Sequence, residues 1–187
     1  MAARNHSYHQ LKLSPVLVIS ISEKKKNIAF KIDGVKAITL KDNRWSRPDI
    51  KTTQLLPNIL AKSHANSMGA YEAIYIDIEG FVTEGSSSNI WILNNNNELI
   101  TRNLDGKVLS GITRNAIIKH ALNNGISFLE RKFSKEELYN AKEIFLTSAS
   151  SFVTPIIQID YFKINNGLVG DLANQLRKLY LMSHVDL

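Results

Sequence analysis

The 187-residue sequence contains no cysteine, and no apolar run approaches the roughly 20 residues that a membrane-spanning helix needs. The absence of cysteine excludes disulfides, thiolate metal sites and cysteine nucleophiles. The first ten residues, MAARNHSYHQ, lack the apolar core of a signal peptide. With 9 glycines, 4 prolines and 21% charged residues, the composition is not that of a disordered or fibrous chain. Together these absences favour a globular protein of the cytoplasm, without a membrane segment.

The sequence is basic, with 23 Lys and Arg residues against 17 Asp and Glu residues and a net charge of +6. Nucleic acids usually bind a stripe of basic residues combined with aromatic side chains or groove-reading elements. Here the basic residues are scattered, apart from the segment 23–27 (EKKKN), and only 8% of the chain is aromatic. We interpret that segment as a charged turn between two strands. The sequence therefore predicts no nucleic-acid partner.

Short β-type runs alternate with helical patterns along the chain. Runs rich in β-branched residues and bounded by turn signals predict strands, and apolar residues three or four apart predict helices. The expected strands are 14–22, 28–32, 35–40, 70–78, 81–83, 88–93, 98–101, 126–132, 143–147 and 155–159. The expected helices are 53–68, 112–123, 134–141 and 171–182. These elements predict a mixed α/β fold in which helices are interleaved with many strands.

Apolar residues recur at helical spacing in three of the expected helices. In the first helix they are Leu55, Leu56, Ile59 and Leu60, with Pro57 tolerated in the first turn. In the second helix, the residues expected to share one face are Ile112, Ala116, Ile117, His120 and Ala121. In the last helix, the residues expected to point inward are Leu172, Leu176, Leu179 and Tyr180.

Lys51 stands where a polar connection meets the first expected helix, within the segment DIKTT. By position alone it is consistent with an ordinary surface lysine. The alternative is partial burial between its apolar and threonine neighbours, which would lower the pKa of its amine. Such an amine is a nucleophile suited to Schiff-base chemistry.

Three further segments carry polar groups at the ends of expected elements. In the segment 82–90, Glu84 follows a strand and precedes a Gly-Ser bend. In the segment 109–114 (LSGITR), a glycine precedes a helix start, where free backbone N–H groups favour phosphate. The segment 147–151 (TSASS) offers small residues whose N–H and hydroxyl groups suit phosphate oxygens. Each of these patterns is also consistent with an ordinary cap or turn.

Taken together, four blocks resemble the class IV (fold type IV) pyridoxal-phosphate aminotransferases in order and approximate spacing. The blocks are DIKTTQLLPNILAK, AYEAIYIDIEGFVTEGSSSNIWI, LSGITRNAII and EIFLTSASSFVTP. The resemblance extends from about Arg4 to Tyr180. It implies the large C-terminal lobe of that fold, a pseudo-barrel of mixed strands, in residues 49–187. Residues 1–48 would then be a remnant of the N-terminal lobe with the strands between the lobes.

The resemblance also implies the cofactor, pyridoxal 5′-phosphate, and the residues that hold it. Lys51 would form a Schiff base with the cofactor and then move the proton between the substrate Cα and the cofactor. Glu84 would face the pyridine nitrogen and keep it protonated. Leu109 would pack against the ring. The residues matching the family's phosphate-binding positions are Ile112, Thr113, Ser148 and Ala149. No metal ion is expected.

The element Arg4-Asn5-His6 points to the D-amino-acid branch, in which an Arg and a His bind the substrate carboxylate across a dimer interface. The implied reaction moves an amino group between a D-amino acid, foremost D-alanine, and a 2-oxo acid such as 2-oxoglutarate. The alternatives within the family are a branched-chain aminotransferase and an aminodeoxychorismate lyase. Another alternative is an inactive or split lobe that needs a separately encoded N-terminal partner.

Two departures from the family pattern accompany the resemblance. The family has a whole N-terminal lobe before the Arg-x-His element, and this lobe supplies a phosphate-binding arginine and a tyrosine. The sequence contains no counterpart of these two residues. Ala149 stands where D-amino-acid members commonly place a hydroxyl residue. Loss of one such hydrogen bond costs about 1–2 kcal/mol.

Overall fold

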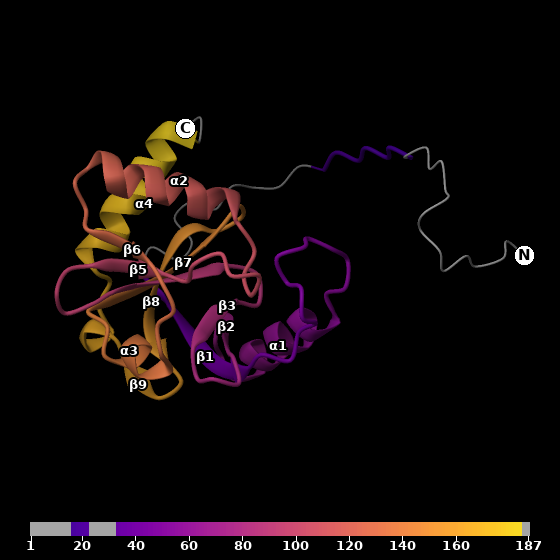
Figure 1. Ribbon diagram of the computed structural model, residues 1–187, viewed down its shortest axis with the longest axis horizontal. Coiled ribbons are helices and arrows are strands. Elements are labelled where there is room, and N and C mark those ends of the chain that lie inside the picture. Colours follow the sequence, from indigo (N-terminus) through magenta and orange to yellow (C-terminus); the bar gives the residue numbers. More distant parts are fainter. Residues whose placement is uncertain (1–15, 23–32, 185–187) are drawn as a thin grey trace, which may run out of the picture.

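A computed structural model describes residues 16–22 and 33–184, and the second range forms a mixed sheet curled into half a barrel (Figure 1). The strands are β1 Val35–Lys41, β2 Glu72–Ile76, β3 Val82–Gly85, β4 Asn89–Leu93, β5 Leu99–Thr101, β6 Phe128–Glu130, β7 Glu143–Ser148, β8 Phe152–Ile159 and β9 Phe162–Lys163. Their spatial order is β3-β2-β1-β8-β7-β4-β5-β6, with β9 paired to β8. The pairs β1/β2, β1/β8 and β5/β6 are parallel, and the other pairs are antiparallel.

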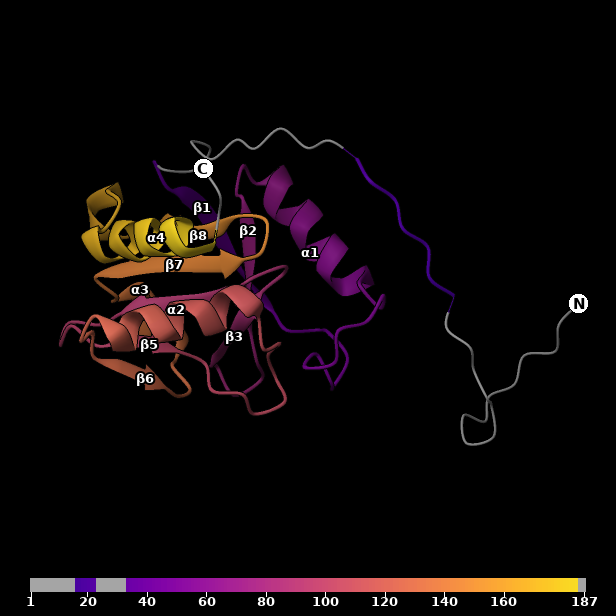
Figure 2. The same ribbon diagram turned by 90° about the horizontal axis from the view of Figure 1, so that it is seen from above.

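Helices cover parts of this sheet on more than one side. They are α1 Leu56–Ser67, α2 Ile112–Asn123, α3 Lys135–Tyr139 and α4 Asp171–His184, with a 3-10 turn at Asn165–Gly167. Helices α2 and α4 contact one another and both contact β7, while α1 contacts β1 and β2 (Figure 2). The mixed α/β fold expected from the sequence is confirmed.

The central strands β4 and β7 separate two parts of the apolar core. Because successive side chains of a strand point to opposite faces, Ile90 and Ile92 enter the cluster inside the half-barrel, whereas Trp91 enters the cluster under α2 and α4. Trp91 pairs with Phe145 across the two strands, and their rings stack with centroids 5.6 Å apart. The antiparallel pair is thereby anchored on both faces.

The expected strand 14–22 is wrong for the residues that the structure describes there. Residues 16–22 have no strand conformation, and Val16 and Ile21 are 88% and 94% exposed. A strand needs a hydrogen-bonded neighbour, and none of the described residues pairs with this segment. Residues 14 and 15 and the expected strand 28–32 lie outside the described residues. Every other expected strand is found, with ends shifted by up to three residues.

All four expected helices are found. Pro57 lies in the first turn of α1, and Gly69, with φ of 70°, follows its end. Ser134 and Glu137 form a capping box, in which each side chain bonds the other residue's backbone N–H at the start of α3. In α4, Leu176 and Tyr180 are buried as expected.

Two helix faces differ from the apolar pattern. In α1, the residues that contact the sheet are Ala61 and Ala65, and the larger apolar side chains are exposed. These exposed residues are Leu55, Leu56, Ile59 and Leu60. In α2, Ile112 is 74% exposed, so its expected place on the buried face is wrong. Ile112 stands in the first turn, where the helix projects to the edge of a cavity.

Candidate active site

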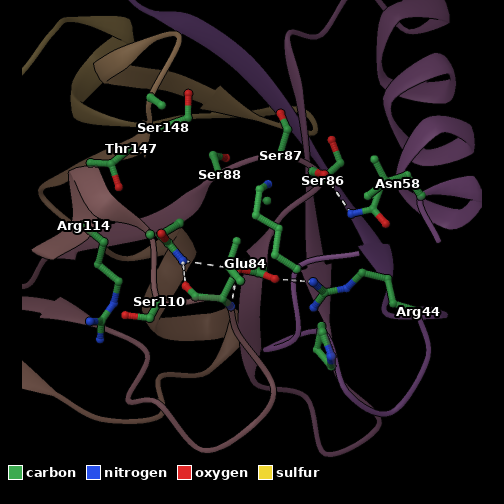
Figure 3. Close-up of a pocket in the computed structure, with 18 of the residues that line it drawn as sticks. Arg44, Asn58, Glu84, Ser86, Ser87, Ser88, Ser110, Arg114, Thr147 and Ser148 are labelled. Atoms are coloured by element: carbon green, nitrogen blue, oxygen red, sulfur yellow. Dashed lines mark hydrogen bonds and ion pairs between the residues drawn. The ribbon is translucent and has the colours of Figure 1, made fainter. Parts of the chain in front are cut away.

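The ends of several elements surround a cavity of about 780 Å³. Its lining comes from the connection before α1, one side of α1, the bend between β3 and β4, the start of α2 and the end of β7. In Figure 3, Arg44 and Asn58 lie on one side of the view, Thr147 and Ser148 on the other, and Glu84 between them.

Seven of the nine predicted site residues line this cavity. They are Lys51, Glu84, Leu109, Ile112, Thr113, Ser148 and Ala149. The other two, Arg4 and His6, lie outside the described residues. The structure therefore brings together segments that are up to 98 positions apart, while the role of each residue stays a prediction.

Lys51 lies in the connection between β1 and α1, and its side chain is exposed. The interpretation of a partly buried lysine is therefore wrong for the part of the chain that the structure describes. Its amine shares the cavity with Glu84, which is the arrangement that the motif order predicted.

Glu84 is the buried acid of the cavity, with 6% of its surface exposed. One carboxylate oxygen accepts a hydrogen bond from Arg44 Nη1. The other accepts from the backbone N–H of Leu109 at 3.0 Å and from Asn89 Nδ2 at 3.2 Å. Loss of water around the carboxylate raises the pKa of Glu84 to about 7, although the charge of Arg44 and the hydrogen bond from Leu109 act to lower it.

Arg44, which sequence reasoning did not single out, holds Glu84 in place. Its guanidinium also donates to both carboxylate oxygens of Asp42, at 2.9 and 2.7 Å, and to the carbonyl oxygen of Lys107 at 3.2 Å. Burial acts to raise the pKa of Asp42, but the hydrogen bonds and charge of Arg44 bring it below its usual value. The guanidinium carbon lies 4.7 Å from the centre of the Tyr75 ring. Arg44 therefore links the end of β1 to the acid of β3.

The start of α2 reaches the cavity without a side-chain cap. The N-cap residue is Gly111, and a Cβ atom built there would lie 2.3 Å from Asn89 Oδ1. Asn89 in turn donates to the carbonyl oxygen of Leu109 at 2.9 Å. The backbone N–H groups of a first helical turn have no partner within the helix. In α2 these N–H groups lie next to Gly111, where a side chain would collide with Asn89.

The end of β7 supplies the second small-residue segment. Ser148 Oγ lies 2.5 Å from Ser151 Oγ and accepts the backbone N–H of Ser151 at 3.1 Å, which closes a tight turn. Ala149 is exposed at this turn. Thr147 is buried, and its hydroxyl accepts from Trp91 Nε1 at 3.0 Å. The turn therefore brings small residues to the cavity at the end of β7.

Two further groups of this region were missed by sequence reasoning. Glu72, at the start of β2, accepts hydrogen bonds from the three serine hydroxyls of residues 86–88. Asn58, on α1, donates to the carbonyl oxygen of Ser86 at 2.8 Å. The available signal for Glu72 was an acid near the start of a mostly apolar β-type run. Among the described residues, no group of acidic or histidine side chains is arranged to hold a metal ion, and no helix has the length and apolar character for a bilayer span.

Comparison with known families gives one match over most of the chain. The family described as amino-transferase class IV matches residues 3–159. A D-alanine aminotransferase of Staphylococcus aureus (strain N315) is 38% identical, over 98% of this chain and 66% of that protein. A D-alanine aminotransferase of Bacillus licheniformis is 39% identical, over 78% of this chain and 50% of that protein. The chain thus spans about two thirds or less of the length of these relatives.

Solved structures with a similar fold include branched-chain aminotransferases. That of Escherichia coli has a TM-score of 0.72 and 28% identity, and the match covers 81% of this chain and 52% of that one. That of Thermobaculum terrenum, solved in its PLP form, has a TM-score of 0.73 and 28% identity, and the match covers 82% of this chain and 51% of that one.

Proposed function

Because the chain belongs to the class IV aminotransferases, we propose that it binds pyridoxal 5′-phosphate and transfers an amino group between a D-amino acid and a 2-oxo acid. The observation that carries the proposal is that Lys51 and Glu84 line one cavity together with two segments suited to phosphate. The relatives named D-alanine aminotransferase support D-alanine as the amino donor, and 2-oxoglutarate is the proposed acceptor.

The residues present fit this cofactor. The uncapped start of α2 offers free N–H groups to a phosphate, and the lack of a side chain at Gly111 keeps the approach open. We assign the phosphate to the backbone of Ile112, to Thr113 and to the turn at Ser148 and Ala149. The cavity lining contains a primary amine on Lys51, the buried carboxylate of Glu84 and an anion site, and each suits a different part of the cofactor.

When bound, pyridoxal phosphate supplies an aldehyde that combines with an amine and a ring that accepts the electrons left at the substrate Cα. Lys51 supplies the amine that anchors the cofactor and, once free, takes the proton from the substrate Cα. Glu84 holds a proton at the ring nitrogen. The side chain of Leu109, which lines the cavity, would pack against the ring.

We assign the substrate carboxylate to Arg4 and His6, which lie outside the described residues. A guanidinium binds a carboxylate with two parallel hydrogen bonds, and an imidazole adds a third. In the proposed homodimer, these two side chains come from the partner protomer. The element Arg4-Asn5-His6 resembles the Arg-x-His element of the family's D-amino-acid branch, and this resemblance supports the assignment.

The first experiment adds pyridoxal phosphate to the purified 187-residue chain and records the visible spectrum. A visible band that is absent in Lys51→Ala, and retained in the control Lys119→Ala on the exposed side of α2, is the expected result. Borohydride reduction followed by peptide mass spectrometry should locate the cofactor at position 51. A colourless wild-type chain, or a label on another lysine, would refute the assignment.

A second candidate keeps the cofactor and changes the substrate. The similarity to the branched-chain aminotransferase structures favours an L-amino acid with an apolar side chain, and an aminodeoxychorismate lyase is the remaining alternative within the family. Activity with D-alanine is compared with activity with L-leucine, each with 2-oxoglutarate. Preference for L-leucine would contradict the roles given to Arg4 and His6.

A third candidate is a lobe that is active only with a separately encoded N-terminal partner. It is supported by the apolar residues that the described part of the chain leaves exposed, at 16–21 and on α1, because such patches usually mark interfaces. Co-expression with the N-terminal third of a D-alanine aminotransferase should then restore activity. Equal activity of the 187-residue chain alone would make the partner unnecessary.

A further inference from the structure

Glu72 is a fully buried acid directly behind the cavity wall, with 1% of its surface exposed. It receives hydrogen bonds from the hydroxyls of Ser86, Ser87 and Ser88, the last two at 3.1 Å. We call these three residues the serine bend. The backbone N–H of Ala73 donates to the same carboxylate at 3.1 Å. Each hydroxyl of the serine bend thus has its proton committed to one side chain.

The serine bend also forms part of the cavity lining. A serine hydroxyl has one proton to donate and two lone pairs that accept. Because all three hydroxyls donate their hydrogen bonds to Glu72, their oxygens offer only lone pairs to a molecule in the cavity. Figure 3 shows the three serine side chains together, on the strand connection above Glu84. This part of the lining therefore offers hydrogen-bond acceptors to the cavity.

Lys62 balances the charge of Glu72. Its ammonium lies 3.4 Å from the nearer carboxylate oxygen and donates to the carbonyl oxygen of Tyr71. The side chain of Lys62 is 29% exposed, and it also lines the cavity. The pair carries no net charge, so the polarity of this wall comes from the orientation of the hydroxyls.

The start of α2 has the opposite polarity. Its first-turn N–H groups donate, and a helix N-terminus favours negative charge. The cavity thus has one lining segment that donates and another that accepts. Because the donating segment is assigned to the phosphate of the cofactor, the accepting segment is the one left to contact the substrate.

We propose that Glu72 is a positioning residue that makes the serine bend an acceptor wall, and that this wall takes the substrate amino group and turns away its carboxylate. The inference rests on the proposed aminotransferase function, because it states how the cavity orientates an amino acid. It concerns the chain's own residues only and can be tested in the chain without cofactor.

The test uses two probes of matched size and opposite character, n-propylamine and propionate. Their affinities are measured by NMR titration of the 187-residue chain without cofactor, from the backbone amide signals of Ser87 and Ser88. The main variant is the double substitution Glu72→Gln with Lys62→Gln, which removes both charges of the pair and leaves the net charge unchanged. The amide side chain offers one acceptor oxygen in place of two, so hydroxyls of the serine bend are released to donate into the cavity.

In the double variant we expect the affinity for propylamine to fall roughly tenfold and that for propionate to rise roughly tenfold, the size of one hydrogen bond to a charged group. A purely structural role would not change the two affinities in opposite directions, because loss of structure weakens the binding of both probes. A parallel loss of both affinities, or no change in either, would overturn the proposal.

Two further variants keep the test decisive. Ser87→Ala removes the exposed hydroxyl of the serine bend and leaves Glu72 in place, so it is suited to the case in which the double variant does not fold. It should weaken propylamine about threefold, as expected for one lost acceptor, without weakening propionate, and equal losses would contradict the proposal. The control is Glu143→Gln, which alters a carboxylate that accepts the N–H groups of Leu172 and Ala173 at the start of α4. It should change neither affinity.

The outcome is separable from that of the proposed function. If the chain never develops a visible band with pyridoxal phosphate but the two probes still respond in opposite directions, only the aminotransferase assignment fails. If the band forms and depends on Lys51 while the probes do not reverse, only the acceptor wall is refuted.

Discussion

The guanidinium of Arg44 and the carboxylate of Glu84 form an ion pair in which both side chains are buried, with 4% and 8% of their surfaces exposed. The two residues are 40 positions apart, with Arg44 in the connection that follows β1 and Glu84 in β3. A buried charge whose partner has been removed is strongly unfavourable, because neither water nor a counter-charge replaces the lost interaction. The acid of the cavity therefore depends on an arginine from the connection after another strand.

Replacing Arg44 with glutamine should destabilise the chain by about 3 kcal/mol, because Glu84 and Asp42 then lose their common cation. The same substitution should move the pKa of Glu84 above its present value of about 7, since the remaining desolvation is no longer opposed by a positive charge. Urea unfolding measures the first effect, and a carboxyl-carbon NMR titration measures the second.

Arg47→Gln is the matched control for this substitution. Arg47 also pairs with an aspartate, Asp49 at 2.8 Å, but 57% of the Arg47 side chain is exposed. Exposed ion pairs contribute little to stability because water screens them, so this variant should unfold at nearly the wild-type urea concentration. Equal losses in the two variants would show that burial of Arg44 is not what makes its ion pairs important.

The elevated pKa of Glu84 predicts a stability that falls as the pH rises. In the unfolded chain, this acid loses its proton near pH 4.5, whereas in the folded chain it keeps it until about pH 7. Between these values the folded state binds more protons, so the free energy of unfolding should decrease by about 3 kcal/mol from pH 4.5 to pH 7. Urea unfolding at half-unit pH steps measures this slope.

The variant Glu84→Gln should remove this slope, because an amide does not titrate. Glu136→Gln, on the exposed side of α3, is the control and should keep it. Asp42 has the opposite effect. Its pKa is lowered in the folded chain, so its ionised form contributes stability above pH 3.8, and this contribution is lost as the pH falls further. The two acids therefore act in separate pH windows. An unchanged slope in Glu84→Gln would contradict the buried position of its carboxylate.

Within residues 33–184, local patterns predicted every helix and every strand except the two-residue strand β9. Their signals, such as the capping box at Ser134 and the proline in the first turn of α1, depend on neighbours a few positions away. The strand expected at 14–22 was wrong because pairing depends on another strand, and the described residues offer none. Ile112 was wrongly placed on the buried face because periodicity does not show where a helix projects past the sheet.

The candidate site was also predictable only in part, because local motifs identified residues but not the contacts between distant ones. The resemblance based on four motifs predicted nine site residues, and seven of them line one cavity. Periodicity alone selected none of them as site residues. The contact between Arg44 and Glu84 could not be predicted, since it depends on β2 bringing β1 and β3 together. The hydrogen bonds from the serine bend to Glu72 also needed the three-dimensional register, because those residues are 14 to 16 positions apart.

Gly111→Ala should weaken the binding of pyridoxal phosphate by about tenfold or more and cost about 1–3 kcal/mol of stability. The added methyl group would lie 2.3 Å from Asn89 Oδ1 and displace the side chain that bonds Glu84 and the carbonyl oxygen of Leu109. The control is Gly125→Ala, where a Cβ meets nothing within 4 Å and only the positive φ of 66° is unfavourable. Titration by absorbance and urea unfolding measure the two effects, and equal cofactor affinity in the two variants would exclude a tight approach at Gly111.

The exposed apolar side of α1 should be tolerant of polar substitution in the isolated chain. Leu56 and Leu60 are 66% and 58% exposed, so Leu56→Ser with Leu60→Ser should change the free energy of unfolding by less than about 0.5 kcal/mol per site. Leu176→Ser, at a fully buried position of α4, should cost about 4 kcal/mol by the same urea measurement. A large loss in the double variant would show that other parts of the same chain cover this side of α1. If instead a partner covers it, the double variant should lose binding to that partner while its own stability is kept, and size-exclusion chromatography of the co-expressed proteins measures that loss.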